Sequence, residues 1–358
     1  MEHDTLSDVL RCVRLRSALY FFVSCSGKWV AEAPSSRAIA AAVMPGTEHV
    51  IEYHVVTGGE CWAAIVGEPP LKLRRGDVVM LTHGDPHVIS SAPGMRADPM
   101  VDSYYAMRRE GRPFRVAYDG GPAPQVSAAG DPAPEVHRNA STTLVCGFIG
   151  CDLRPFNPLI ATLPRLLHLP RTDGGGWSDR FLEAAAQEPT LRGPGGEALL
   201  ERMSEMMFID AVRRHVEALP ERSTGWLAGL RDRHVGRALA LMHAKPGARW
   251  TLDELSKDVG LSRSALHERF VELVGQPVMQ YLTSWRMQLA SQRLRSSQAS
   301  VAAIAVDVGY DSEAAFSRAF KRLVGHPPGT WRRQQAARDA ERSGVDGGSK
   351  KPANTRPR

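Results

Sequence analysis

The stretch VAAIAVDVGYDSEAAFSRAFKRLVGHPPGTW, residues 301–331, repeats an earlier part of the same chain. The earlier copy, LDELSKDVGLSRSALHERFVELVGQPVMQY, occupies residues 252–281. Gly260 corresponds to Gly309 at an offset of 49, and after one inserted residue the copies continue to match at an offset of 50. The matched positions keep their apolar or glycine character, which indicates an internal repeat of one structural unit.

Each copy has the pattern of two helices joined by a tight turn. In the first copy, apolar residues at helical spacing precede Gly260, whose permissive backbone suits a sharp turn. Ser262 is then placed to cap a second helix with Leu266 and Phe270 on its inner face. The alternative is a pair of hairpins that only pack together, but the short turn and the capped, basic second helix favour a helix-turn-helix.

The second helix of such a unit fits the major groove of DNA and places its N-terminal residues at the base edges. Glu268 is an unusual residue for this face, because a carboxylate accepts from cytosine but repels phosphate. The second unit is therefore expected to contribute more to specificity. The candidate DNA contacts are Ser262, Arg263, Ser264, His267, Glu268, Ser312, Glu313, Ala314, Ser317, Arg318, Lys321 and Arg322.

The connector between the copies, residues 277–294, reads as one helix with a proline near its start and an apolar stripe. It would hold the recognition helices at a fixed separation, and successive major grooves on one face of DNA are about 34 Å apart. Residues 225–333 resemble the DNA-binding domain of the AraC family, through DELSKDVGLSRSALHERF, YLTSWRMQLA and IAVDVGYDSEAAFSRAFKRLVGHPPGTWRR. Pro328 and Trp331 match the family's final proline and aromatic residue. The resemblance implies a homodimeric regulator with double-stranded DNA and RNA polymerase as partners; we expect an activator, although the sequence does not decide between activation and repression. The cytoplasm is the expected compartment.

The distribution of charge supports a division of the chain into an N-terminal part and a C-terminal DNA-binding part. Residues 1–225 hold 23 Lys and Arg against 27 Asp and Glu, whereas the remainder holds 22 against 12. A basic module joined to a mildly acidic one is expected when only the first meets phosphate. The chain has no apolar run long enough to span a membrane, no signal-peptide core, and five irregularly spaced cysteines without a disulfide or zinc pattern.

The front of the chain is rich in short strands. From residue 49 to 90, β-branched runs alternate with Gly and Pro turns, which predicts a small antiparallel barrel or sandwich. The run GDVVMLTHGDPH resembles the second cupin motif, with Thr82 where proline is usual. The first cupin motif is partial, because residue 52 is glutamate where a histidine is expected. AraC-like regulators commonly carry such a barrel, and by that resemblance it would bind a small-molecule effector, with candidate residues His54, Glu60, Trp62, His83 and His87.

A metal in the barrel is the open alternative for these polar residues. His54, Glu60 and His87 are candidate ligands, with His83 as a further donor, and a metal-dependent cupin enzyme fused to a DNA-binding domain is the second functional hypothesis. We favour ordinary buried histidines beside a ligand pocket, with no cofactor expected and no enzymatic activity. Cys146 and Cys151 raise a further hypothesis, a redox-sensitive pair, although buried cysteines are more often inert.

The predicted fold class is α+β: an N-terminal cupin-like β-barrel with a helical appendage, then an all-α domain of two helix-turn-helix units joined by a linker helix. The expected domains are residues 1–170 for effector sensing, 171–224 for a helical dimerisation or linker region, 225–335 for DNA binding and 336–358 for a disordered tail. Several local predictions accompany this division. They are a flexible loop at 119–135, a strand pair at 142–153, a helix at 157–169 and a helix at 196–219 that either packs in the core or forms a dimer interface.

Overall fold

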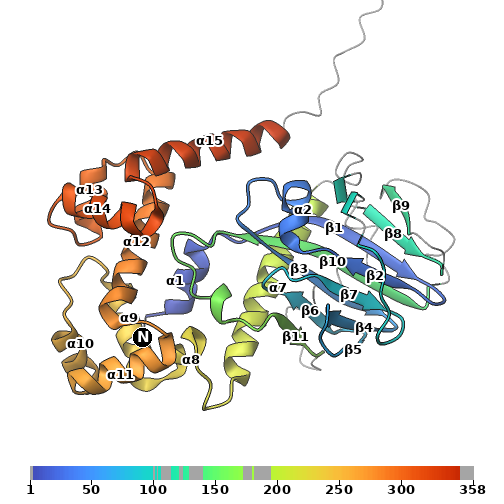
Figure 1. The fold of residues 1–358 in the computed structure, drawn as a ribbon, viewed down its shortest axis with the longest axis horizontal. Coiled ribbons are helices and arrows are strands. Elements are labelled where there is room, and N and C mark those ends of the chain that lie inside the picture. Colours follow the sequence, from blue (N-terminus) through green and yellow to red (C-terminus); the bar gives the residue numbers. More distant parts are fainter. Residues whose placement is uncertain are drawn as a thin grey trace, which may run out of the picture.

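The structure is a computed structural model that describes residues 3–99, 101–102, 104–105, 114–120, 124–128, 140–171, 180 and 195–346. It is an α+β fold in which a strand-rich N-terminal part adjoins a helical C-terminal part (Figure 1). No helix in the described ranges is long and apolar enough to cross a membrane. The first half of the expected linker, residues 172–179 and 181–194, lies outside the described ranges.

Two sheets form the N-terminal part. The larger has the strand order β11-β6-β3-β10-β1-β8-β9 and the smaller has the order β2-β7-β4-β5. All their neighbouring strands are antiparallel except β1 and β8, which are parallel. The strands are β1 (Arg16–Cys25), β2 (Val30–Ala33), β3 (His49–Gly58), β4 (Glu60–Ile65), β5 (Leu71–Arg74), β6 (Val78–Leu81), β7 (His87–Ser90), β8 (Phe114–Tyr118), β9 (Gln125–Ala128), β10 (Thr142–Cys151) and β11 (Leu166–Leu169).

Strand β3 contributes side chains to two hydrophobic cores, one on each face. Successive side chains of a strand point to opposite faces. Ile51, Tyr53 and Val55 pack against the helices, whereas Val50 and Val56 pack between the two sheets. The alternation makes β3 a shared wall, and the run from Val50 to Val56 is buried on both faces.

Three local predictions were wrong. Residues 142–151 form the single long strand β10 rather than a strand pair, since the whole run is paired with both β1 and β3. Residues 157–169 do not form a helix, because Pro164 falls in its interior, and one 3-10 turn (Ile160–Thr162) precedes strand β11. Part of the expected loop at 119–135 is strand β9, which pairs with β8; residues 121–123 and 129–135 of it lie outside the described ranges.

Helices α1 (Thr5–Cys12) and α2 (Ser36–Val43) accompany the sheets, and helices α7 to α15 lie in the second half of the chain. The predicted helix at 196–219 is present as α7 (Gly196–Ala218), packed on β1 and β11. The others are α8 (Trp226–Arg231), α9 (Arg233–Ala244), α10 (Leu252–Val259), α11 (Arg263–Val274), α12 (Val278–Ser296), α13 (Val301–Asp307), α14 (Glu313–Val324) and α15 (Pro328–Asp346).

Helix α15 corrects the predicted tail. Residues 336–346 continue this helix instead of being disordered, since the run ARDAER is composed mostly of strong helix formers. Residues 347–358 lie outside the described ranges.

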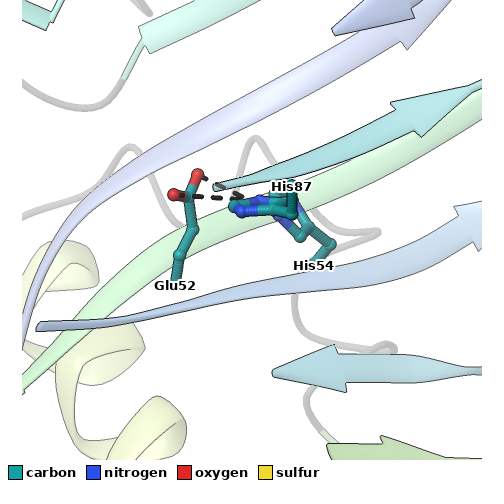
Figure 2. Close-up of side chains that lie close together, drawn as sticks. All are labelled: Glu52, His54 and His87. Carbon is teal, nitrogen blue, oxygen red and sulfur yellow. Dashed lines mark hydrogen bonds and ion pairs between the residues drawn. The ribbon is translucent and has the colours of Figure 1, made fainter. Parts of the chain in front are cut away.

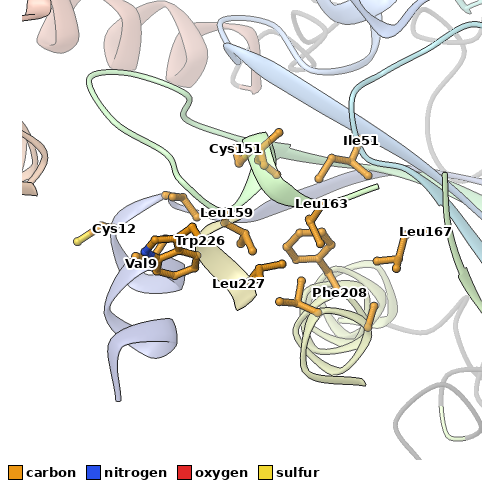
Figure 3. Packing of buried hydrophobic residues seen from close by; sticks show 14 of the residues in the cluster. Val9, Cys12, Ile51, Cys151, Leu159, Leu163, Leu167, Phe208, Trp226 and Leu227 are labelled. Carbon is orange, nitrogen blue, oxygen red and sulfur yellow. The ribbon is translucent and has the colours of Figure 1, made fainter. Parts of the chain in front are cut away.

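A single apolar cluster joins the two halves of the molecule. Phe208 of α7 packs under the large sheet, and Trp226 and Leu227 of α8 continue the cluster toward Val9 of α1 (Figure 3). The cluster extends into the first helix-turn-helix unit, where it includes Phe270. A separate cluster, centred on residues of α12, α13 and α14, forms the core of the second unit. The first unit therefore shares its core with the strand-rich N-terminal part, and the second has a core of its own.

Candidate nucleic-acid interface and ligand cavity

The first helix-turn-helix unit is built as its sequence predicts. Helix α10 begins at Thr251, which forms a capping box with Glu254, and ends at Gly260 with a φ of 74°. The Ser262 side chain then accepts a hydrogen bond from the Ala265 backbone N–H at 3.2 Å and so starts α11. The turn is short because a left-handed glycine and a serine cap lie only two positions apart.

The second unit repeats this geometry. Gly309 has a φ of 85°, and the Ser312 side chain accepts from the Ala315 backbone N–H at 3.2 Å to start α14. Phe316 is buried on the inner face of α14, and Lys321 and Arg322 lie in its last turn. Positive charges in the last turn of a helix stabilise it, because they interact favourably with the negative end of the helix dipole.

Of the twelve predicted DNA contacts, Ser317 is half-buried and all the others are exposed. They lie on α11 and α14 or at their caps, so each set belongs to one recognition helix. Arg269, by contrast, is held by an internal ion pair in which its Nε lies 2.8 Å from Asp232 Oδ2. The contact residues themselves stay a prediction.

A second candidate site is a cavity of about 90 Å³ in the strand-rich part. Its wall is formed by β1, β2, β3, β7, β8 and β10, together with Trp29, Tyr104 and Pro124. Glu52, His54 and His87 are buried polar residues of this wall, and Glu32, which pairs with Arg96, also lines it. The mostly apolar and aromatic remainder includes Phe21, Val23, Trp29, Ala31, Ala33, Ile89, Tyr104, Val116, Tyr118, Leu144 and Cys146.

The three polar side chains lie together (Figure 2). His87 Nδ1 donates to the Asp85 carbonyl oxygen at 3.0 Å, which leaves its Nε2 as an acceptor. His54 Nε2 therefore donates to His87 Nε2 at 2.7 Å, and His54 Nδ1 accepts from the Cys146 thiol at 2.9 Å. Glu52 lies 3.9–4.0 Å from the two Nε2 atoms, and its Oε2 has no hydrogen-bond partner although it is buried.

Burial controls the charge of this group. It raises the pKa of Glu52 to about 8 and lowers the pKa of His87 to about 4, where the Asp85 carbonyl and carboxylate act in the opposite direction. The pKa of His54 is lowered well below its usual value, by burial first and by His87 second. At neutral pH the three side chains are therefore mostly uncharged when nothing is bound.

The structure separates the other proposed effector residues from the cavity. The Glu60 side chain is 59% exposed and its Oε1 pairs with Lys72 Nζ at 2.7 Å, because β4 turns this carboxylate to solvent. Trp62 lies beside a different, outer groove next to Gly67. His83 is exposed in the β6–β7 turn, where its Nε2 meets the Leu163 carbonyl oxygen at 3.1 Å. Of the five proposed effector residues, the cavity contains His54 and His87.

The residue that the sequence analysis missed is Glu52. Residue 52 was treated only as the place of an absent histidine, although its spacing of two from His54 on a strand puts both on one face. Trp29, Tyr104 and Tyr118 were also missed as cavity residues, and Tyr104 comes from a segment without a strand pattern.

The cysteine pair does not form a switch of the expected kind. Cys146 and Cys151 lie on the same strand, β10, five residues apart. They therefore point to opposite faces of the sheet. At a rise of about 3.3 Å per residue, their Cα atoms are about 16 Å apart, which is farther than the roughly 7 Å that a disulfide can span. Burial also raises the pKa of both thiols, which disfavours the reactive thiolate.

A cupin-like domain joined to two helix-turn-helix units defines a DNA-binding transcription regulator. Residues 4–217 match a family described as cupin, and residues 255–334 match one described as a helix-turn-helix domain. The chain is 32% identical to an AraC-like transcription regulator of Streptomyces lividans, over 92% of this chain and 98% of the relative. A relative from Streptomyces antibioticus, also AraC-like, is 32% identical over the same shares of the two chains. The chain belongs to the AraC family of transcription regulators.

Among solved structures, the DNA-binding domain of AdpA in complex with a target DNA is similar to part of the chain. It is 27% identical, covers 31% of this chain and 97% of its own, and has a TM-score of 0.29.

The cupin fold can hold a metal, and Glu52, His54 and His87 suit one. Their potential ligand atoms all lie within 4.8 Å of one another, and two imidazoles with a carboxylate are a common donor set for first-row divalent ions. The unpartnered, buried Glu52 Oε2 favours a nearby cation, and the Asp85 carbonyl orients His87 as metal-bound histidines usually are. A bound ion would supply a Lewis-acidic position in the wall of the cavity.

Proposed function

We propose that this regulator binds DNA under the control of a small, largely apolar effector in the cupin cavity. The observation that carries the proposal is a buried cavity with an apolar, aromatic lining and one unpartnered carboxyl oxygen, on Glu52. Ligand sites commonly combine apolar walls with a few placed polar groups. At about 90 Å³ the cavity suits a compact molecule with one hydrogen-bonding group.

The effector's influence would travel through β3. Glu52 and His54 face the cavity, and Tyr53 between them points to the opposite face, where its hydroxyl lies 2.8 Å from Ser204 Oγ on α7. A ligand that shifts β3 therefore shifts the surface on which α7 packs. Helix α7 also contacts α8, which belongs to the apolar cluster shared with the first helix-turn-helix unit.

A second route joins α1 to the linker helix. Gln288 of α12 is buried, and its Nε2 donates to the Cys12 carbonyl oxygen at 3.2 Å while its Oε1 accepts from the Phe156 backbone N–H at 3.1 Å. These bonds tie the cupin side to the helix that spaces the two recognition helices. A change in the cupin domain would thereby change the relative position of the two recognition helices. This route acts within one chain, so it would operate in a monomer and in a dimer.

Blocking the cavity tests effector control. Ala31 lines the cavity from β2 and is only half-buried, so Ala31→Trp should fill the space without disturbing a core. A panel of small aromatic and aliphatic compounds would be screened by thermal shift, since a ligand that binds the folded state raises its melting temperature. We expect stabilising compounds to lose their effect on Ala31→Trp and to keep it on the matched Ala31→Ser.

The proposal fails if the same compounds stabilise the Ala31→Trp protein, because they would then bind elsewhere. It also fails if stabilising compounds leave operator binding of the wild-type protein unchanged. DNA binding by Ala31→Trp in the absence of compound is the control for folding.

The second recognition helix is proposed to read bases through Arg318. Arg318→Ala should weaken binding to the operator by roughly 1–3 kcal/mol and leave binding to unrelated DNA nearly unchanged, as loss of one base contact does. The matched control is Arg249→Ala, since Arg249 is exposed in the same domain but lies outside both recognition helices. Equal losses on operator and unrelated DNA would instead make Arg318 a phosphate contact.

A metal-dependent activity of the cupin domain is the second candidate function, favoured by the cluster of Glu52, His54 and His87. The two candidates differ in metal content. Stoichiometric iron, manganese or zinc in the purified protein, lost on His87→Ala, would favour the enzyme. Metal-free protein that still answers to an effector would favour the sensor.

A further inference from the structure

A second cavity lies where the two halves of the molecule meet. It has a volume of about 330 Å³ and shares no residue with the cupin cavity. Its walls come from the end of α1, the segment after β10, and helices α12 and α15. In Figure 1 helix α1 lies between α12 and the sheets, so the cavity is bounded by sensor and DNA-binding elements together.

Arginines from both sides line this interdomain cavity. Arg11, Arg14 and Arg154 belong to the cupin side, and Arg295 belongs to the linker helix α12. Arg295 is only 10% exposed, and its Nη1 lies 3.2 Å from Asp152 Oδ2.

Carboxylates in and beside the lining pair with some of these arginines. The lining contains Asp152 and Glu48, and Glu48 Oε1 lies 3.3 Å from Arg154 Nη2. Asp8, outside the lining, lies 3.4 Å from Arg11 Nη1. The lining thus contains four guanidinium groups and two carboxylates, so its formal charge is positive.

Two further features point to a ligand. Trp331 lines the cavity, is 7% exposed, and its Nε1 has no hydrogen-bond partner although it can only donate. A buried donor without an acceptor is costly, and an anionic oxygen would satisfy it. Arg14 has a φ of 52°, a left-handed conformation that is rare for a residue with a side chain and that occurs preferentially at binding sites.

The geometry points to a binding site for a small phosphate-bearing molecule in the interdomain cavity. Phosphate oxygens match the planar fork of arginine, and several guanidinium groups around one cavity are the usual means of holding a multiply charged phosphate. The volume exceeds that of inorganic phosphate and leaves room for an organic part of the size of a sugar or a nucleoside.

Such a ligand would connect the two halves of the protein. Contacts from Arg11 and Arg154 on one side and from Arg295 and Trp331 on the other would fix the sensor relative to α12 and α15. This site would give the regulator a second input that is independent of the cupin cavity. Because α12 spaces the recognition helices, the anion would change the geometry with which they reach DNA.

Calorimetric titration of the full-length protein with inorganic pyrophosphate tests the site. We expect saturable binding of one pyrophosphate per chain, weakened at least tenfold in the double variant Arg11→Gln, Arg154→Gln. Both side chains are more than half exposed, so their loss should not prevent folding. The matched control is Arg202→Gln on α7, an exposed arginine far from the cavity in sequence, which should bind like the wild type.

Three results would overturn the proposal. The first is the absence of saturable pyrophosphate binding at low ionic strength, where electrostatic attraction is strongest. The second is equal weakening by Arg202→Gln, which would indicate diffuse surface charge. The third is competition between pyrophosphate and an unrelated DNA duplex in the wild-type protein, which would make the cavity a contact for the DNA backbone.

Discussion

Replacing Glu52 with glutamine should stabilise the metal-free protein by about 4 kcal/mol at pH 8, a gain that shrinks as the pH falls. Glu52 is buried without a partner for Oε2, and burial raises its pKa from 4.5 to about 8. Unfolding releases the carboxyl into water, where it ionises freely at neutral pH. Glutamine has nearly the same shape but does not ionise, so ionisation no longer favours the unfolded state.

The direction in which stability changes with pH follows from the number of protons bound in the folded and unfolded states. Between pH 4.5 and about 8 the folded state holds a proton on Glu52 that the unfolded state releases, so stability falls as the pH rises. His54 and His87 act in the opposite sense, because their lowered pKa values cost stability only below about pH 6.5. From pH 6.5 to 8 Glu52 acts without them, and we expect the wild type to lose about 1–2 kcal/mol there.

Urea titrations at pH 6.5 and pH 8 with a metal chelator present measure this slope. The matched control is Glu60→Gln, since Glu60 is exposed and its pairing with Lys72 stabilises by no more than about 1 kcal/mol. A slope that is the same in wild type and Glu52→Gln would contradict a neutral, buried Glu52. Restoring zinc or manganese extends the experiment: stabilisation of the wild type but not of Glu52→Gln would show that the cluster binds metal.

The DNA-binding half could be predicted closely because its signals are local. Caps, turn glycines and apolar spacing specify each helix-turn-helix within about thirty residues, and Ser262 and Ser312 start their helices as expected. A repeat within one chain provides an independent check on each copy. The core of such a unit forms from residues that are near one another in sequence, so the local pattern of apolar residues is enough to predict most of its structure.

The ligand cavity could be predicted only in part because it depends on strand pairing. His54 and His87 meet across two sheets, and neither the partner strands nor their register follows from local sequence. Glu52 could have been found by applying the two-residue period of a strand to its neighbour His54. Likewise Pro164 argued against the helix predicted at 157–169, because a proline in a helix interior removes a hydrogen bond and restricts the residue before it.

Phe316→Ala should abolish the second helix-turn-helix unit while the rest of the protein stays folded. Phe316 is fully buried, and its ring packs against Tyr310 at 5.6 Å and Phe320 at 5.5 Å between ring centroids. Truncating a buried phenylalanine costs about 3–5 kcal/mol, more than a small cluster can lose and remain folded. We therefore expect operator affinity to fall to the level of unrelated DNA, with the effector response of the cupin cavity retained.

The separation of the two apolar clusters makes this loss local. Phe316 lies in the cluster of the second unit, whereas Phe270 of the first unit, the counterpart of Phe320, belongs to the cluster that extends through α8 to the cupin domain. Hydrogen exchange should show loss of protection confined to α13 and α14 in Phe316→Ala, but spread into the cupin domain in Phe270→Ala. Leu323→Ala is the matched control on α14, since Leu323 is 41% exposed and its truncation should cost less than about 1 kcal/mol. If Phe316→Ala loosened the sensor as much as Phe270→Ala does, the second unit would not be an independent folding element, and loss of DNA binding could not be assigned to its recognition helix.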